Sequence, residues 1–416
     1  MIEPIILARA VHLAATTLAA GTVCFMVLVV EPAFGSARGS AFATLRWRAN
    51  VMSWAALATA IASGAIWLAL LAADIYGAPL VAVCLHGGLW AVLTGTQFGA
   101  VWCARLALAL LLAALLVRPE LRWLQLAAAG ALIALIALTG HAGATPGAAG
   151  QLHLASDVVH LIAAGVWLGG LPALVLLLFS ARPPRGLAAR AAVRFSALGV
   201  ASVGALLLSG IVNSWMLLSA PRDLIATDYG RLLSLKIGLF AAMLALAAVN
   251  RFHLTPRLAT TAARRALMRN SLAETVLGAG VLLLVGALGT MQPAAHIHLL
   301  PENIPEDAAF VHIHSEQAMA DVMINPGRAG TATASIRVMH DDSSEFPASE
   351  IRLTLDPPAP GPRPIDRVAV RQRDGTWRVD GIALGGPGNW MVRVIVPDEH
   401  GKQIVLDAPI VIAPAQ

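Results

Sequence analysis

The chain has 416 residues, of which 57% are hydrophobic and only 13% are charged, and its formal net charge is +5. Soluble globular domains carry roughly a quarter charged residues, so this composition excludes a soluble protein along the whole length. The positive charge does not indicate a nucleic-acid partner, because the arginines are concentrated in short segments between long apolar runs.

Long apolar runs recur throughout residues 1–292. A helix needs about 20 apolar residues to cross roughly 30 Å of hydrocarbon, and these runs approach that length. The first run is longer than the core of a signal peptide and is predicted to be a retained span. Glycines interrupt residues 80–94, which we predict to be a re-entrant or interfacial segment. The eight predicted spans cover residues 5–30, 50–73, 97–117, 121–140, 154–180, 195–220, 232–250 and 271–291.

Arginines are distributed unequally between alternate loops of this pattern. One set of loops holds fourteen and the other holds two, Arg222 and Arg231. Loops rich in Lys and Arg stay in the cytoplasm, so the count predicts a multi-pass protein of a bacterial inner membrane with both termini in the periplasm. The fourteen are Arg38, Arg46, Arg48, Arg118, Arg122, Arg182, Arg185, Arg190, Arg194, Arg251, Arg257, Arg264, Arg265 and Arg269.

The composition changes abruptly from Gln292 onward. Short segments rich in β-branched residues, such as 351–355 and 391–396, alternate with turn signals such as Asn325-Pro326-Gly327. Short strands at roughly ten-residue spacing are typical of a small sandwich. We therefore predict an α-helical polytopic bundle at 1–292, followed at 293–416 by a small all-β, immunoglobulin-like sandwich domain in the periplasm.

Ionisable residues inside spans are costly and are functional candidates by default. His153, Asp157 and His160 lie at i, i+4 and i+7 of the fifth span, so they share one helix face near its outer end. His141 precedes that span by a short loop, and His12 lies one turn or so into the first span from the same side. The pattern predicts a metal or haem site, with Asp157 orienting an imidazole. The alternative is that each histidine only forms a hydrogen bond with a neighbouring helix.

The C-terminal domain contains two H-x-H pairs, His296 with His298 and His312 with His314. Residues i and i+2 of a strand point to the same side, so each pair can present two imidazoles together. Several methionines, including Met319, Met323 and Met339, are nearby in the sequence. Imidazole and thioether donors together suit copper, and thioether favours Cu(I). The alternative is a solvated strand face with methionines in the core.

Motifs for other chemistries are missing from the sequence. It contains no P-loop, no G-x-G-x-x-G after a strand, no H-E-x-x-H and no G-x-S-x-G. We therefore do not expect an enzyme or a nucleotide-driven pump.

Several motifs on the spans together resemble a known family. The longest is the stretch from Asp157 to Leu171, D-V-V-H-L-I-A-A-G-V-W-L-G-G-L. The others are Thr96-Gln97-Phe98-Gly99 leading into Arg105, Arg194-Phe195-Ser196 followed by Ser209-Gly210, the segment from Thr227 to Lys236, and Asn250-Arg251. This set resembles the copper resistance D (CopD) family of membrane proteins over most of residues 1–292. The tail resembles a YtkA-like β-sandwich through its H-x-H pairs, Asn325-Pro326-Gly327 and Gly388-Asn389-Trp390.

The resemblance implies a protein that transports or handles copper at the inner membrane, beside a periplasmic copper chaperone of the CopC type. No CopC-like domain precedes the first span, so a separate chaperone is an expected partner unless the C-terminal domain replaces it. The leading hypothesis is a copper transporter in which His12, His141, His153 and His160 accept the ion. One alternative is a b-type haem protein that transfers electrons. Another is a copper sensor or assembly factor whose bundle only anchors it.

Overall fold

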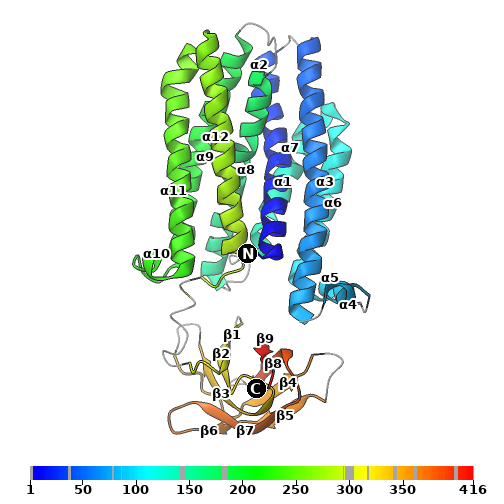
Figure 1. The fold of residues 1–416 in the computed structure, drawn as a ribbon, viewed down its shortest axis with the longest axis vertical. Helices are drawn as coiled ribbons and strands as arrows, with labels where there is room; N and C mark the ends of the chain where they lie inside the picture. Colours follow the sequence, from blue (N-terminus) through cyan, green and yellow to red (C-terminus); the bar gives the residue numbers. More distant parts are fainter. Residues whose placement is uncertain are drawn as a thin grey trace. The chain divides into compact units, whose positions relative to one another are not determined.

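A computed structural model of the chain describes residues 3–35, 39–76, 79–85, 87–140, 147–179, 186–293, 295, 304–315, 318–340, 344–358, 363–397 and 402–415. The chain divides into two compact units, residues 1–70 with 90–296 and residues 71–89 with 297–416. The first unit is a helical bundle, and β-sheets form most of the second (Figure 1). The predicted boundary between residues 292 and 293 stays a prediction, because residues 71–89 are grouped with the sheets.

Eight helical segments in the described part are long and apolar enough to cross a membrane. They are Pro4–Phe34 (α1 Pro4–Phe25, η1 Met26–Val30, α2 Glu31–Phe34), Ser40–Tyr76 (α3), Gln97–Leu116 (α6), Pro119–Thr139 (η2 Pro119–Leu121, α7 Arg122–Ala134, η3 Ala137–Thr139), Ala148–Phe179 (within α8, Gly147–Phe179), Leu187–Leu217 (α9), Asp228–Arg257 (α11 Asp228–Val249, η5 Asn250–Leu254, η6 Thr255–Arg257) and Thr261–Leu288 (α12). Short helices α4 (Leu80–Leu85), α5 (Gly88–Gly95) and α10 (Asp223–Ala226) lie between spans. The predicted eight-span bundle with a C-terminal β-domain is confirmed.

Several helices start well before the apolar runs that predicted them. The starts of α3, α9 and α12, at Ser40, Leu187 and Thr261, precede the predicted spans by eight to ten residues. The added turns contain arginines, whose long side chains extend to the polar interface while their stems cover apolar surface. Hydrophobicity therefore predicts the length of helix in the hydrocarbon but not the length of the helix itself.

The centre of the bundle is the contact between α1 and α8, where glycines allow the two backbones to touch. Gly21 lies against Gly165 and Gly169, and a Cβ on Gly169 would lie 2.0 Å from the Thr17 carbonyl oxygen. Lipid offers no hydrophobic drive for helices to associate, so close contact between small residues has to stabilise them. Most of α1 is buried as a result, whereas only a small part of the span that contains α11 is buried.

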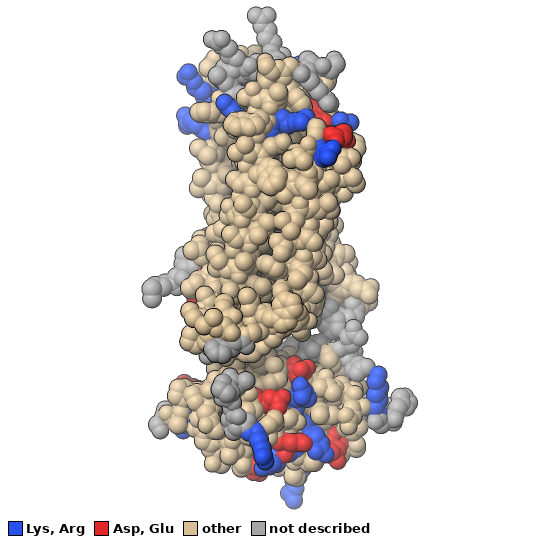
Figure 2. Space-filling model, turned by 90° about the vertical axis from the view of Figure 1, so that its right-hand side faces the viewer, with Lys and Arg blue, Asp and Glu red and all other residues tan. Residues whose placement is uncertain are grey.

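The two ends of the bundle differ in charge. Figure 2 shows Lys and Arg side chains at one end, with a long uncharged zone below them. Arg122 forms a 3.1 Å ion pair with Glu31 at this end, and Arg190 Nε donates to the Ala33 carbonyl oxygen at 3.0 Å. The first residues of α1 and the end of α12 lie at the opposite end (Figure 1), where Arg9 Nη1 donates to the Gly289 carbonyl oxygen at 2.6 Å.

The C-terminal β-domain consists of two antiparallel sheets with the strand orders β1-β2-β3-β7-β6 and β5-β4-β8-β9. Side chains alternate between buried and partly buried along β8, as expected for strands with one face in a core. The strands are β1 Ala309–His314, β2 Met319–Asn325, β3 Gly330–Met339, β4 Arg352–Asp356, β5 Ile365–Val368, β6 Val370–Arg371, β7 Trp377–Leu384, β8 Gly388–Pro397 and β9 Gln403–Ile412.

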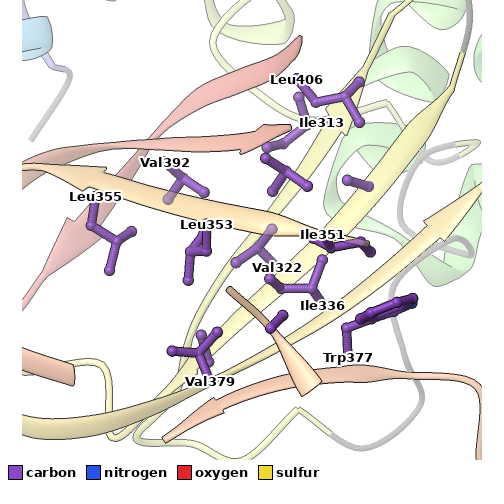
Figure 3. Close-up of a cluster of buried hydrophobic side chains, with 14 of the residues drawn as sticks. Ile313, Val322, Ile336, Ile351, Leu353, Leu355, Trp377, Val379, Val392 and Leu406 are labelled. Atoms are coloured by element: carbon purple, nitrogen blue, oxygen red, sulfur yellow. The ribbon is translucent and has the colours of Figure 1, made fainter. Parts of the chain in front are cut away.

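The core of this domain is aliphatic and lies between the two sheets. Val322 and Ile336 from one sheet and Leu353 and Val392 from the other point toward one another (Figure 3), and all four are buried. Trp390 is also buried, and its indole Nε1 donates to the Gly386 carbonyl oxygen at 3.0 Å. A buried tryptophan with its N–H bonded adds apolar contact area without an unsatisfied donor.

We expect Gly169→Val to destabilise the bundle strongly, because the new side chain would overlap the backbone of α1 at Thr17. Overpacking of a tight interior costs about 1–3 kcal/mol, and a backbone that cannot move aside raises that figure. Gly204→Val on α9 is the matched control, since a Cβ there meets no atom within 4 Å. Thermal unfolding of the two variants in detergent, followed by size-exclusion chromatography, measures the difference. Equal stability would contradict the proposed role of the α1–α8 contact.

Candidate functional site

Three of the predicted site residues lie on α8 in the half that is far from the arginine-rich end. His153, Asp157 and His160 share one helix in the register that the sequence predicts. His153 is buried, and its Nδ1 has no hydrogen-bond partner among the described residues. Asp157 and His160 are partly buried and contact α9.

A serine on α9 orients the His160 ring. His160 Nδ1 lies 3.0 Å from Ser209 Oγ, and the Ser209 hydroxyl donates its proton to the Ala205 carbonyl oxygen at 2.6 Å. A hydroxyl has one proton to donate, so Ser209 Oγ accepts from His160 Nδ1–H. In the neutral ring, Nε2 then carries the lone pair. Histidines that bind metals commonly have this arrangement, in which one ring nitrogen binds the metal and the N–H of the other donates a hydrogen bond.

Asp157 lies in a polar network that joins three helices. Asn213 Nδ2 on α9 donates to Asp157 Oδ1 at 3.1 Å. The charge of Lys236 on α11 acts on both Asp157 and His160, and the charge of Asp157 acts on Tyr229. The carboxylate is therefore hydrogen-bonded to α9 and lies within electrostatic reach of the Lys236 ammonium group.

Sequence reasoning did not select Ser209, Asn213 or Tyr229 as functional residues. Ser209 belongs to the Ser209-Gly210 pair and Tyr229 to the segment from Thr227 to Lys236, both of which resemble the CopD family. Those two motifs could have identified Ser209 and Tyr229 as candidates. Asn213 gave no signal of its own, because an uncharged amide in an apolar run does not stand out.

His12 on α1 is held in the same way as His160 but by a different part of the bundle. Its Nδ1 lies 2.7 Å from the Ala60 carbonyl oxygen on α3, which can only accept, so Nδ1 carries the proton. Nε2 is buried without a hydrogen-bond partner in the described part of the chain. A cavity of about 20 Å³ beside the ring is lined by Thr16, Trp102 and Arg105, among others. A cation bound there would lie near the Arg105 guanidinium group.

His12 and His160 occupy the same depth but face different helices. Each lies nine residues before a glycine of the α1–α8 contact, Gly21 and Gly169, which is about 13 Å of helix rise. The first and fifth spans run in the same direction, so the two rings are level. His12 contacts α3 and α6, however, whereas His160 contacts α9. Within the described ranges, no group of three or more His, Cys, Asp or Glu side chains is placed to hold a metal ion.

One face of the β-domain carries a second group of predicted donors. Directly opposite residues of antiparallel strands project from the same face. The register across β1, β2 and β3 aligns three rows of positions on the face opposite the core, Phe310–Met323–Ser335, His312–Asp321–Arg337 and His314–Met319–Met339. We call these rows the donor face.

Within the donor face, His312 Nδ1 lies 2.6 Å from Asp321 Oδ1, and both side chains are largely buried. A carboxylate on one ring nitrogen fixes the imidazole orientation and raises its basicity as a ligand. Met319 is fully buried, and Met323 and Met339 are partly buried. The register therefore adds Asp321 to the predicted histidine and methionine set.

Some predicted site residues cannot be placed. His141, His296 and His298 lie outside the described residues, and the description of His314 is limited to its backbone in β1.

Comparison with known proteins identifies two matching family models within the bundle. Residues 1–151 match the N-terminal domain of copper resistance protein D-like proteins, and residues 189–288 match copper resistance protein D. Both matches end before the β-domain. No solved structure matches the chain.

Three relatives are similar over parts of the chain. Copper transport protein CutJ of Bacillus subtilis is 29% identical over 314 residues, which cover 72% of this chain and 56% of CutJ. Inner membrane protein YebZ of Escherichia coli is 33% identical over 210 residues, or 49% of this chain and 72% of YebZ. Copper resistance protein D of Pseudomonas syringae pv. tomato is 32% identical over 230 residues, 49% of this chain and 71% of the relative. The chain thus spans little more than half the length of CutJ.

We expect Asp157 and Lys236 to be energetically coupled, because removing either one leaves the other charge unbalanced inside the bundle. We expect this coupling in a double-mutant cycle with Asp157→Asn and Lys236→Gln. The double variant should lose about 0.5–3 kcal/mol less free energy of unfolding than the sum of the losses in the two single variants. Chemical unfolding in detergent micelles measures the cycle. The control cycle uses Asp228 and Arg231, an exposed ion pair of 3.1 Å on the same helix, which should show no resolvable coupling. Equal coupling in both cycles would contradict the prediction.

Proposed function

The chain belongs to the copper resistance protein D family, and from this membership we propose that it transports copper across a bacterial inner membrane. Its relatives are named as a copper transport protein, a copper resistance protein and an inner membrane protein. Those names and the eight candidate spans support a copper-related membrane function. The role of the histidines and the direction of movement are part of the proposal.

The observation that carries the proposal is the orientation of His12 and His160. Both rings donate from Nδ1 to an oxygen of a neighbouring helix, and both keep the Nε2 lone pair for another partner. They are level in the bundle, in the half opposite the arginine-rich end. We propose that copper enters at this half, that His153 and His141 complete the entry region, and that Asp157 orients the site.

The proposed direction of copper entry follows from the distribution of arginines in the loops. Arginine-rich loops stay in the cytoplasm, so the arginine-rich end of the bundle is assigned to the cytoplasm and the termini to the periplasm. Copper is then accepted from the periplasmic side. The proposal includes delivery of the ion by a CopC-type chaperone or by the β-domain.

The donor face of the β-domain fits the same substrate. Its thioethers and imidazole are soft and intermediate donors that suit copper, with Cu(I) favoured by the thioethers. We propose that this face binds copper before the bundle does, with Asp321 holding the His312 ring and His296, His298 and His314 adding further donors.

A b-type haem would need two span histidines that face each other as axial ligands. The described contacts direct His12 toward α3 and α6 and His160 toward α9, which favours copper handling at separate rings over a shared haem. An absorbance spectrum of the purified protein with a Soret band would reverse this choice.

We expect purified protein in liposomes to take up copper, and His160→Ala or His12→Ala to reduce the uptake rate at least tenfold. Ser209→Ala should reduce copper affinity by roughly 10–100-fold, as loss of an oriented ring does at other metal sites. His253→Ala is the control, since this exposed histidine in η5 lies at the arginine-rich end. Uptake that survives the combined replacement of His12 and His160 would contradict the proposed entry site.

We expect the donor face to bind copper in the full-length protein. Asp321→Ala should weaken binding by roughly 10–100-fold, because the His312 ring loses the carboxylate that orients it. His340→Ala serves as the control, since that ring packs against Phe346 and lies outside the donor rows. Competition with a Cu(I)-chelating dye measures the affinity. If deletion of residues 293–416 leaves both binding and uptake unchanged, the β-domain has no part in copper delivery.

A further inference from the structure

A cavity of about 380 Å³ lies between α8, α9, η5 and α12 in the arginine-rich half of the bundle. Its walls are mainly apolar and include Trp167, Leu171 and Phe195. Val200 and Phe252 also line it and are exposed, so the cavity is reached from outside the protein at that point. None of the predicted copper ligands that the structure describes lines this cavity.

A buried carboxylate lies in this apolar space. Glu274 of α12 is 1% exposed, and Asn250 Nδ2 donates to its Oε1 at 2.5 Å. The Asn250 amide is held from its other side, because its Oδ1 accepts from Asn270 Nδ2 at 3.0 Å. Asn250 begins the π-helical turn η5, and such turns are frequent at functional sites.

No described side chain neutralises this carboxylate. Arg251 is the other charged residue among the described lining of the cavity, and its Nη1 donates to Ser196 Oγ at 2.8 Å. The α8, α9 and α11 segments contribute no charged residue to the described lining. His253 of η5, Arg257 of η6 and the α12 residues Arg264, Arg265 and Arg269 lie outside it. A carboxylate at this depth without a cation is costly unless it binds a proton or another cation.

The surrounding donors favour a proton over a metal ion. Glu274, Asn250 and the hydroxyls of Ser196 and Ser271 offer oxygen atoms and amides, which Cu(I) does not favour. Ser271 Oγ is buried and has no hydrogen-bond partner within the described ranges, so it can accept a hydrogen bond from a protonated carboxyl group or a water molecule.

We propose that Glu274 is a proton-binding site, loaded and unloaded through this cavity, that couples copper transport to the proton gradient. The coupling rests on the proposed function. The two helices that carry the copper-side polar groups continue to the cavity: α8 carries His160 and then Leu171, and α11 with η5 carries Lys236 and then Asn250. The rise between Lys236 and Asn250 is about 21 Å, so the proton site and the copper entry are separate sites on shared helices.

Infrared difference spectroscopy of the purified full chain, without copper, tests the proton site directly. A protonated carboxylic acid has a C=O stretching band that disappears when it titrates. We expect Glu274→Gln to remove one titrating band that Glu120→Gln retains. Glu120 is the matched control, an exposed carboxylate at the arginine-rich end. Identical spectra for the two variants, or a Glu274 band that does not titrate, would overturn the proposal.

Copper uptake into liposomes with a pH dye in the lumen tests the coupling. We expect wild-type uptake to change several-fold with an imposed pH gradient and to be accompanied by proton movement. Glu274→Gln should lose both effects, Glu274→Asp should restore part of them, and Glu120→Gln should behave as wild type. Gradient-sensitive uptake by Glu274→Gln would overturn the coupling alone. Wild-type protein that moves no copper would overturn the proposed function and the coupling with it, while the infrared result still decides whether Glu274 binds a proton.

Discussion

The contact between the backbones of α1 and α8 is the constraint on which the arrangement of the bundle depends. Gly21 and Gly169 leave no room for a side chain there, so only glycines at these positions allow the two helices to lie this close. Lipid is as apolar as the helices, and close contact between small residues replaces the hydrophobic effect as the source of stability. This contact fixes which face of α8 meets α1 and which face is left for α9. The orientation of every polar group on α8 follows from it.

One consequence is that the polar groups of the spans are divided between two sides of the central pair. His12 and Arg105 lie among α1, α3 and α6, whereas Asp157 and His160 lie against α9 and α11. Each group has a partner inside the protein rather than in lipid, as the cost of burying polar atoms requires. The depth of His12 and His160 is nevertheless shared, because both lie the same number of residues before the glycine contact.

The sequence predicts the features that depend on the local chain and fails on those that depend on packing. Span number follows from the length of the apolar runs, and the shared side of His312 and Asp321 needs only strand alternation once the register is known. The helices α3 and α12 begin before their apolar runs because their first turns contain arginines. The separation of His12 from His160 depends on a contact between Gly21 and Gly169. The sequence around either glycine does not predict that the two residues meet.

The buried charges bear on whether the bundle transports an ion or only anchors the β-domain. An anchor needs apolar surface and nothing more. A charged residue at the centre of a span costs roughly 2.5–3.5 kcal/mol on insertion scales, and the cost falls toward the ends of the span. Arg105, Asp157, Lys236 and Glu274 each add a cost of this kind. Partners such as Asn213 and Asn250 offset part of that cost, but they are themselves polar groups that an anchor would not need. Apolar residues at all these positions would give a more stable anchor, so the charges support the proposed passage of ions through the bundle.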